Sequence, residues 1–368
     1  MAYTTIDDSE LYFQCKVYSG SSSDVTVTFD GTNDMQPDLV WLKKTSASGD
    51  PLLYDAVRGV NKRLQPSGAD AEVDRSGNDD ELKAFNSDGW TLGTFNSNVT
   101  GSGATCISWN WKANGTGSSN TDGTINTAAT SANTTAGFSI VSYTGNASSN
   151  QTVGHGLGAV PHWILSKNRD NSSSNYNDWM VYHHKNATAN DKKLKLNETD
   201  AASSTNEWGD TDPTSTVYSV HTSGDGATND GTDKIVSYVW TSIKGFSKFG
   251  KYEGNNNADG PYVFTGFRPA FVLIKRRGGA NGWFLSDTKR VGFNGVATNS
   301  ATVGNPELSP NLARYEAEGN TNWVDIYSNG FKPRITGNDT NGASETYLYM
   351  AFAYQPMVNS DGIHSNAR

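Results

Sequence analysis

A tryptophan set between acidic residues is the part of this chain best suited to bind a sugar. The segment Glu-Trp-Gly-Asp-Thr-Asp contains Trp208, Asp210 and Asp212. The indole ring could stack on pyranose C–H groups while the carboxylates accept hydrogen bonds from hydroxyl groups, a combination that ligand sites use. The adjacent pair His183 and His184 adds further hydrogen-bonding groups. These five residues are the predicted ligand site, and a core position for Trp208 is the alternative.

One catalytic pattern is present only in part. A family of β-sandwich glycanases places three acids on one strand as Glu-x-Asp-x-x-Glu, and glycoside hydrolysis needs two such carboxylates beside the bond. Glu72 and Asp74 begin this pattern, but Gly77 stands where the acid/base glutamate is needed. The sequence also lacks the Gly-x-Ser-x-Gly turn that presents a nucleophilic serine. We therefore expect that the protein is not an enzyme, and we assign no catalytic residue.

Metal and cofactor sites are not predicted either. A calcium loop requires a glutamate six residues after its glycine. Residues 255–260 fit the first half of that loop, but Gly266 occupies the position of the glutamate. His183 and His184 are neighbours in a strand-like run, so their side chains should point to opposite faces of the strand. The predicted metal and cofactor content is therefore none.

Charge and hydropathy exclude two classes of partner. The formal net charge is −9, which opposes binding to the phosphates of nucleic acid. The sequence has no apolar run of the length that a membrane span requires. Its first residues lack the basic start and apolar stretch of a signal peptide. We expect no nucleic-acid partner and no membrane insertion.

The elements that must position any site occur three times along the chain. Each copy has a Tyr-x-Gly motif, and then a proline, a short apolar run and a lysine at a fixed spacing from the proline. Because two independent markers keep one relative offset, the chain is predicted to be a tandem repeat. The tyrosines are Tyr18, Tyr143 and Tyr252, and the proline-to-lysine elements are 37–43, 161–167 and 269–275.

An acid and an arginine recur after these elements. Asp55 and Arg58 match Asp287 and Arg290 in spacing, whereas the second copy has a histidine pair at this place. A structural ion pair beneath a loop is favoured over a functional site.

Composition predicts an all-β chain. Charged residues make up only 18% and aromatic residues 11%, and the apolar runs are short, rich in Val, Ile, Tyr, Phe and Trp, and bounded by turn-forming residues. Each repeat has about the size of one β-sandwich. We predict three tandem β-sandwich domains of jelly-roll or concanavalin A-like type. The predicted divisions are an N-terminal segment (1–10), repeat 1 as candidate anchor (11–113), a linker (114–136), repeat 2 (137–244), repeat 3 (245–357) and a C-terminal tail (358–368).

Both cysteines, Cys15 and Cys106, lie in strand-like runs of repeat 1. A disulfide between neighbouring strands is conceivable, but buried free thiols are favoured because no secretion signal is visible.

Several long motifs resemble one family of proteins. The chain is similar to structural proteins of tailed bacteriophages, of the marine phage type, that are described as tail fibre or receptor-binding proteins with concanavalin A-like lectin domains. The resemblance covers nearly the whole chain and implies a β fold and a place on the virion, with no catalytic residues to transfer. The matching stretches are GFSIVSYTGN (137–146), TVGHGLGAVP (152–161), KFGKY (248–252), DGPYVFTGFRPAFVLIK (259–275), YSNGFK (327–332) and TYLYMAFAYQP (346–356).

The predicted function follows from these observations together. We expect a tail-fibre-type virion protein, made in the host cytoplasm, that attaches to host surface glycan and contacts other virion proteins. A homo-oligomer, most simply a trimer, would strengthen weak single sites through multivalency. The alternative is a structural or decoration protein of capsid or tail without a ligand, and a polysaccharide depolymerase is less favoured.

Overall fold

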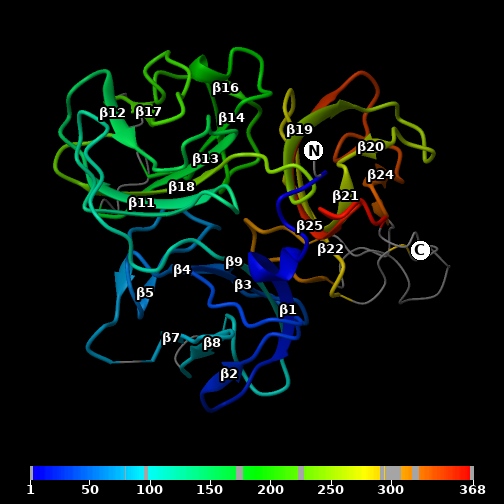
Figure 1. Ribbon diagram of the computed structural model, residues 1–368, viewed down its shortest axis with the longest axis horizontal. Helices are drawn as coiled ribbons and strands as arrows, with labels where there is room; N and C mark the ends of the chain where they lie inside the picture. Colours follow the sequence, from blue (N-terminus) through cyan, green and yellow to red (C-terminus); the bar gives the residue numbers. More distant parts are fainter. Residues whose placement is uncertain are drawn as a thin grey trace.

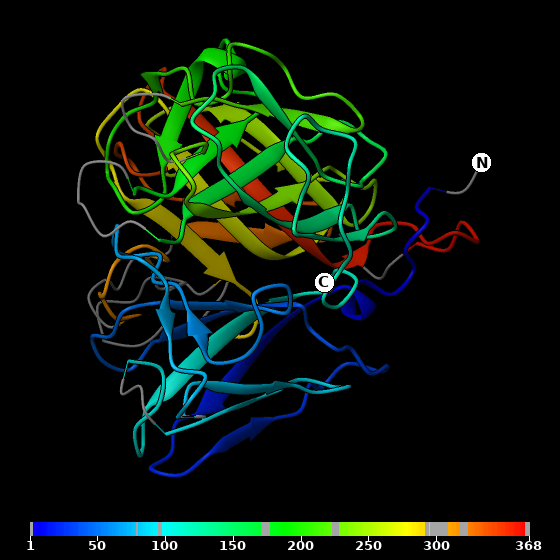
Figure 2. The same ribbon diagram turned by 90° about the vertical axis from the view of Figure 1, so that its left-hand side faces the viewer.

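The computed structural model describes residues 3–78, 80–94, 98–170, 177–222, 228–290, 294, 308–316 and 323–364. In this part of the chain, apart from two short 3₁₀ helices, η1 (Ser9–Leu11) and η2 (Ala189–Asp191), the regular structure is β-sheet. The prediction of an all-β fold is confirmed. Figure 1 shows three lobes around a common centre, and Figure 2 shows the same lobes from the side. We call them unit 1 (β1–β9), unit 2 (β10–β18) and unit 3 (β19–β25).

Unit 1 is built from two facing sheets. They enclose a core that includes Tyr18, Val40, Tyr54 and Trp90. The larger sheet has the order β1 (Phe13–Ser19), β9 (Thr105–Trp111), β3 (Leu39–Lys44), β4 (Leu52–Asp55), the smaller has the order β2 (Val25–Val27), β8 (Trp90–Leu92), β7 (Leu82–Phe85), and a separate pair is β5 (Lys62–Arg63) with β6 (Val73–Asp74).

Unit 2 repeats this arrangement with a wider sheet. Its core includes Val141, Tyr143, Ile164 and Tyr218. The wide sheet has the order β10 (Ala129–Asn133), β11 (Phe138–Thr144), β18 (Lys234–Trp240), β13 (Trp163–Asn168), β14 (Met180–His183), β15 (Lys192–Lys195), β16 (Ser203–Ser204), and it faces β12 (Gln151–Gly154) paired with β17 (Val217–Val220).

Unit 3 returns to two small sheets. Its four-stranded sheet and three-stranded sheet meet at side chains such as Tyr252, Val263 and Phe331. The first has the order β19 (Ser247–Glu253), β25 (Thr346–Pro356), β21 (Phe267–Arg276), β22 (Trp283–Asp287), and the second has the order β20 (Val263–Phe264), β24 (Gly330–Pro333), β23 (Val324–Tyr327).

The strand register is the same in all three units. We call the strand that carries the Tyr-x-Gly tyrosine (β1, β11 or β19) the first strand of its unit. In each unit this strand pairs with the last, the last with the proline-to-lysine strand, and that strand with the next in sequence. The lysine strand and the last strand align at corresponding positions, which are Trp41↔Trp109, Leu165↔Tyr238 and Leu273↔Met350. The repeat seen in the sequence is therefore a repeat of topology and of register.

Residues 114–136 are not the linker that their composition suggested. Their strand β10 pairs with β11 along its whole length, the Ser118 amide donates to the carbonyl of Thr130 at 3.2 Å, and Ile125 is buried in the core of unit 2. A sheet edge accepts a strand through backbone hydrogen bonds, which do not depend on side-chain type. A Ser-, Thr- and Ala-rich segment can therefore form an edge strand.

The Tyr-x-Gly motif ties the first strand of each unit to the loop before its last strand. Each tyrosine hydroxyl is buried and donates to a backbone carbonyl of that loop, and the glycine allows the same loop to pass closely. The hydroxyl bonds are Tyr18 to Val99 at 2.8 Å, Tyr143 to Thr228 at 2.6 Å and Tyr252 to Thr340 at 2.6 Å. A Cβ on the glycine would lie too close to a carbonyl oxygen of that loop. The distances from such a Cβ are 2.5 Å to the oxygen of Gly101 for Gly20, 2.6 Å to that of Asp230 for Gly145 and 2.2 Å to that of Gly342 for Gly254.

The repeated lysine joins each unit to another one. Every lysine Nζ is buried at the end of its strand and donates both to its own unit and to a loop of a neighbouring unit. The bonds between units are Lys43 to the carbonyl of Leu312 at 2.5 Å, Lys167 to Ala69 at 3.1 Å and Lys275 to Thr199 at 2.8 Å. Unit 1 thus binds unit 3, unit 2 binds unit 1, and unit 3 binds unit 2, so the three head-to-tail contacts close a ring.

A single hydrophobic cluster fills the centre of this ring. It takes aromatic side chains from the large sheets of all three units, among them Trp41, Trp109, Trp163, Trp240 and Phe271. Units 1 and 2 each have a further core between their own two sheets. Because the three large sheets also share the central cluster, we expect the ring to unfold as one cooperative body.

The lysine contacts predict a specific loss of stability. Replacing Lys167 by Met leaves the carbonyls of Ala69, Asn168 and Asn177 without their donor, and each unpaired buried carbonyl is costly. Methionine also avoids the cost of burying an ammonium group, which offsets part of this loss. We therefore expect a net decrease of about 3 kcal/mol in the free energy of unfolding, measured by urea denaturation. The control is Lys234→Met at the exposed first residue of strand β18, where the lysine side chain is 62% exposed. Equal urea midpoints for both variants would contradict this role.

Candidate functional site

The predicted tryptophan lies in the core and not on a surface. Trp208 is 1% exposed, its Nε1 donates to the carbonyl of Lys192 at 3.1 Å, and its ring meets Tyr182 edge-on at 5.7 Å. Asp210 and Asp212 are exposed in the loop that follows. Because the indole ring has no free face, Trp208 cannot stack on a sugar, and its predicted binding role is wrong.

The two predicted histidines belong to a different place, the contact between units 2 and 3. His183 is buried and its Nε2 lies 3.2 Å from the carbonyl oxygen of Tyr349. His184 has its Nε2 at 2.9 Å from the carbonyl of Phe249. Alternation along β14 sends Tyr182 into the core with Trp208 and His183 to the opposite face. The five predicted residues therefore do not form one site.

These histidines are held in the neutral form. The ring of His184 stacks on His162 with centroids 3.9 Å apart, and the backbone amide of Lys185 donates to Nδ1 of His183 at 3.0 Å. An Nδ1 that accepts this bond leaves the proton on Nε2, which can then donate to Tyr349. Burial lowers the pKa of His183 to about 3 and that of His184 to about 4. The cluster is a structural joint between units.

The neutral histidines predict a pH dependence of stability. An unfolded histidine titrates near pH 6.5, whereas the folded pKa values lie lower, so between about pH 6.5 and 4 only the unfolded chain binds these protons. Stability is therefore complete above about pH 6.5 and falls as the pH drops. Urea midpoints between pH 7.5 and 5 measure this slope. In His184→Gln, which keeps a donor but cannot titrate, the slope should decrease, and an unchanged slope would refute the assignment.

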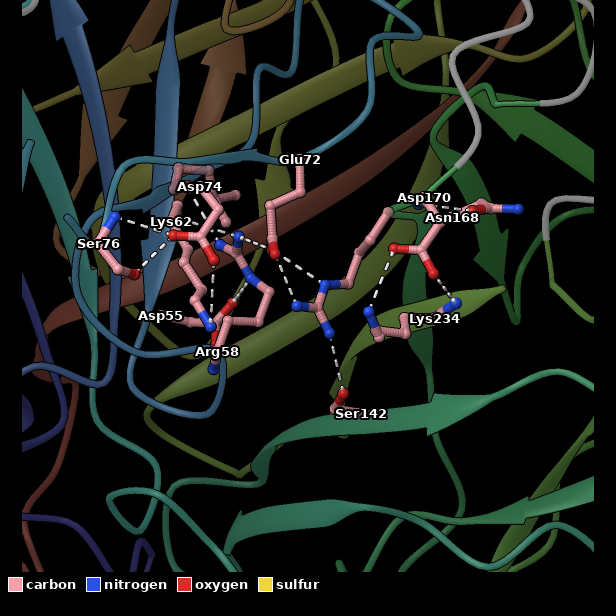
Figure 3. Close-up of polar contacts among 12 residues, drawn as sticks. Asp55, Arg58, Lys62, Glu72, Asp74, Ser76, Ser142, Asn168, Asp170 and Lys234 are labelled. Carbon is pink, nitrogen blue, oxygen red and sulfur yellow. Dashed lines mark hydrogen bonds and ion pairs between the residues drawn. The ribbon is translucent and has the colours of Figure 1, made fainter. Parts of the chain in front are cut away.

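A network of buried charges joins units 1 and 2. Arg58 is paired with Asp55 at 2.5 Å and with Glu72 at 2.8 Å. The carboxylate of Glu72 also accepts hydrogen bonds from Nε and Nη2 of Arg169, at 2.9 and 2.7 Å. Figure 3 shows Glu72 between the Asp55–Arg58 pair on one side and Ser142 on the other. The predicted Asp–Arg ion pair is thus present.

This network is structural chemistry and not a catalytic site. The hydroxyl of Tyr238 donates to Asp55 at 2.6 Å, which adds a bond from unit 2. The hydrogen bonds and charges of both arginines hold the pKa of Glu72 below its usual range despite its burial. A carboxylate that is fully engaged and charged has neither the proton nor the free lone pairs of a catalytic acid or base.

Removing one charge of the network should therefore weaken the ring. For Glu72→Gln we expect a loss of about 3 kcal/mol in stability, because Arg58 keeps Asp55 while Arg169 is left with an uncompensated buried charge. Asp170→Asn is the matched control, since Asp170 pairs with Lys234 at 3.8 Å on the surface and such pairs contribute little. Thermal or urea unfolding compares the two. An effect of equal size in both variants would contradict a central role for Glu72.

An open groove in unit 3 is the structure's best candidate for binding. It has a volume of about 410 Å³ and is lined by β19, β20, the Tyr349 side chain and Lys185 from unit 2. Tyr262 and Phe264 stand on its rim, 48% and 46% exposed. Few large apolar side chains of the described chain are this exposed, and such residues mark interaction surfaces when they gather.

The groove keeps its shape through contacts of its own residues. Tyr262 rests edge-on against Tyr327 at 5.7 Å, and Lys248 donates to the carbonyl of Phe264 at 2.7 Å. Gly250 leaves the floor open, because a Cβ there would lie 2.5 Å from the hydroxyl oxygen of Tyr349. The aromatic rings are therefore held in position before any ligand arrives, which reduces the cost of binding.

The edge strand beside the groove is closed to another strand at one point. The amide of Phe249 donates to the Ser242 hydroxyl at 3.3 Å, and its carbonyl faces His184 at 2.9 Å. Both partners come from unit 2. Since the outward backbone groups of Phe249 are occupied, the groove is better suited to side-chain recognition than to strand addition.

The charged residues that line the groove are all basic. They are three lysines, Lys185, Lys248 and Lys251, and the described lining contains no carboxylate. Over the described ranges, no group of three or more His, Cys, Asp or Glu is placed to hold a metal ion. In the same ranges, no helix is both long enough and apolar enough to cross a membrane.

The sequence contains an alternating pattern at the rim of this groove. Tyr262, Val263 and Phe264 alternate between exposed and buried positions, with the valine inward. In an antiparallel sheet, alternation shows that two faces differ. It does not show which face is covered, and aromatic residues are the ones usually assigned to the core.

Comparison with known proteins gives a family but no activity. A family model described as a domain of unknown function, DUF7483, matches residues 8–356. The match begins beside η1 and ends at the last residue of β25, so it treats the three units as one piece. No curated protein matches the chain.

Proposed function

We propose that this chain, which belongs to the DUF7483 family, is a carbohydrate-binding surface protein of a bacteriophage particle that attaches it to host glycan. The observation that carries the proposal is the groove of unit 3, where Tyr262 and Phe264 present aromatic rings beside polar groups. Exposed rings can stack on the C–H faces of sugar rings, and neighbouring donors can bind hydroxyl groups. An open groove suits a polymer, which must enter and leave along its length.

The phage context of this proposal rests on the sequence motifs that resemble tail fibre proteins, such as residues 259–275. That segment includes the groove strand β20 and the lysine strand β21. One weak groove on each chain would hold a cell firmly only if several copies act together. A trimer of this chain on the virion, in contact with other virion proteins, is therefore part of the proposal.

A structural role without a ligand is the second candidate. The three lysine contacts and the charge network around Glu72 favour it, because they make a closed and strongly tied body. Such a body would serve as a decoration protein of capsid or tail. A depolymerase is less favoured, since the groove lining described by the structure lacks the pair of carboxylates that glycoside hydrolysis needs.

The groove rings provide the test. The double variant Tyr262→Ala and Phe264→Ala should bind host surface polysaccharide at least about tenfold more weakly, since each ring contact is worth roughly 1 kcal/mol. Glycan-array signals and adsorption of the purified protein to host cells measure this.

The control is Tyr354→Ala, a similarly exposed aromatic residue, 38% exposed, outside the groove lining. It should bind as the wild type does. A wild-type protein that binds no host glycan would favour the structural candidate, and equal binding by the groove variant would remove the groove.

A further inference from the structure

We infer that the groove of unit 3 selects an anionic polysaccharide, one that carries carboxylate or sulfate groups, through Lys185, Lys248 and Lys251. This inference rests on the proposed glycan-binding function and specifies its ligand.

The charge of the groove is opposite to that of the chain. The protein has a formal net charge of −9, yet the charged residues that line the groove are three lysines. Lys185 and Lys251 are exposed and Lys248 is partly buried. An open channel of one sign attracts ligands of the other sign and raises their local concentration.

The fold itself does not require these lysines. The common register places Lys248 at the position of Gln14 in unit 1 and Ser139 in unit 2. It places Lys251 at the position of Val17 and Ser142. The other two copies of this strand thus keep their backbone pairing with neutral residues at these places, so the positive charge belongs to the surface of unit 3.

The edge of unit 3 is also the one left open for a ligand. In unit 2 the corresponding first strand, β11, is covered by β10. In unit 1, β1 contacts unit 3 at Cys15, whose thiol is 3.9 Å from the carbonyl of Ala270. Strand β19 contacts unit 2 at Phe249 and borders the groove along residues 248–252. The same structural position thus lines a binding groove in unit 3.

The lysines are placed around the aromatic rings. Nζ of Lys248 lies 5.3 Å from the centre of the Phe264 ring and uses one proton on the carbonyl of Phe264. An ammonium group has three donors, so two remain for a ligand oxygen. Lys185 comes from unit 2, beside His184. A sugar ring on the aromatic rim would thus have Lys248 beside it and Lys185 and Lys251 in the same lining, available to its acidic substituents.

Lysine also indicates how selective the groove is. Its ammonium acts as a compact point charge, whereas the arginine fork matches the planar geometry of particular anions. We therefore expect recognition of charge density along a polymer, shared by carboxylated and sulfated chains, and not of a single sugar.

The experiment compares three polymers on the full-length protein. Polygalacturonate supplies carboxylates, dextran sulfate supplies sulfates, and dextran is the neutral reference, with affinities and their salt dependence measured by calorimetry or affinity electrophoresis. The double variant Lys185→Gln and Lys251→Gln should bind one or both polyanions at least about tenfold more weakly. The slope of log affinity against log salt should fall by about two, one for each lost charge.

The matched control removes the same charge elsewhere. Lys62→Gln with Lys234→Gln takes two lysines that pair with Asp74 and Asp170 on units 1 and 2, and polyanion binding should not weaken. Unfolding midpoints of all variants must agree with the wild type, so that loss of binding reflects the groove.

The outcomes separate the two claims. If the lysine variant binds polyanions like the wild type while the Tyr262 and Phe264 variant loses glycan binding, the anionic selectivity is wrong and the glycan function stands. If the wild type binds dextran as tightly as the polyanions, the selectivity is also wrong. If the wild type binds neither the polyanions nor any host glycan, the proposed function fails and this inference fails with it.

Discussion

The structure depends on the hydrogen bonds of the repeated lysine, which lies at the end of the proline-to-lysine strand in each unit. Its ammonium group is buried among backbone carbonyls of its own unit and of another unit. A buried cation without partners would be very costly, so each lysine can be buried only while the neighbouring loop is in place. Since the three contacts run in one direction around the ring, each unit both supplies a lysine and receives one.

The three contacts between units share the same backbone hydrogen bonds and differ in the side chains around them. The residue two positions after each lysine accepts a backbone hydrogen bond from the neighbouring unit. The donor and acceptor pairs are Glu72 N–H to Arg169 C=O, Ala202 N–H to Arg277 C=O, and Glu316 N–H to Thr45 C=O. Between units 1 and 2 these positions carry the charge network. Between units 2 and 3 the arginine bonds Asn186 at 2.9 Å, and histidines fill the remaining space. Between units 3 and 1, threonine replaces the arginine, and burial raises the pKa of Glu316. Backbone geometry is thus common, while the side chains differ in part, since Glu316 still pairs with Arg290 as Glu72 does with Arg58.

Ring closure also decides where a ligand could bind. The inner faces of the large sheets are used by the shared aromatic core, β10 covers the edge of β11 in unit 2, and Cys15 of β1 contacts unit 3. The groove of unit 3 remains, with rings and lysines that the common fold does not need. A rigid frame that presents one variable surface is the usual arrangement for recognition. The groove's outward rings and uniform positive charge are the features on which the proposed glycan attachment depends.

The sequence by itself determined the all-β class and the threefold repeat, and it favoured the free thiols that the structure has at Cys15 and Cys106. Strand patterning and spaced motifs are local properties, so they can be recognised without coordinates. The structure corrected the linker at 114–136, because edge pairing of β10 depends on an available strand and not on its composition. The structure also places Trp208 and His183 in different environments. Alternation shows that neighbouring strand residues point to opposite faces, but it does not show which of the two faces another unit covers. Only the tertiary structure decided that the repeated lysines join different units and that Tyr262 and Phe264 point outward, since both follow from contacts between residues far apart in the chain.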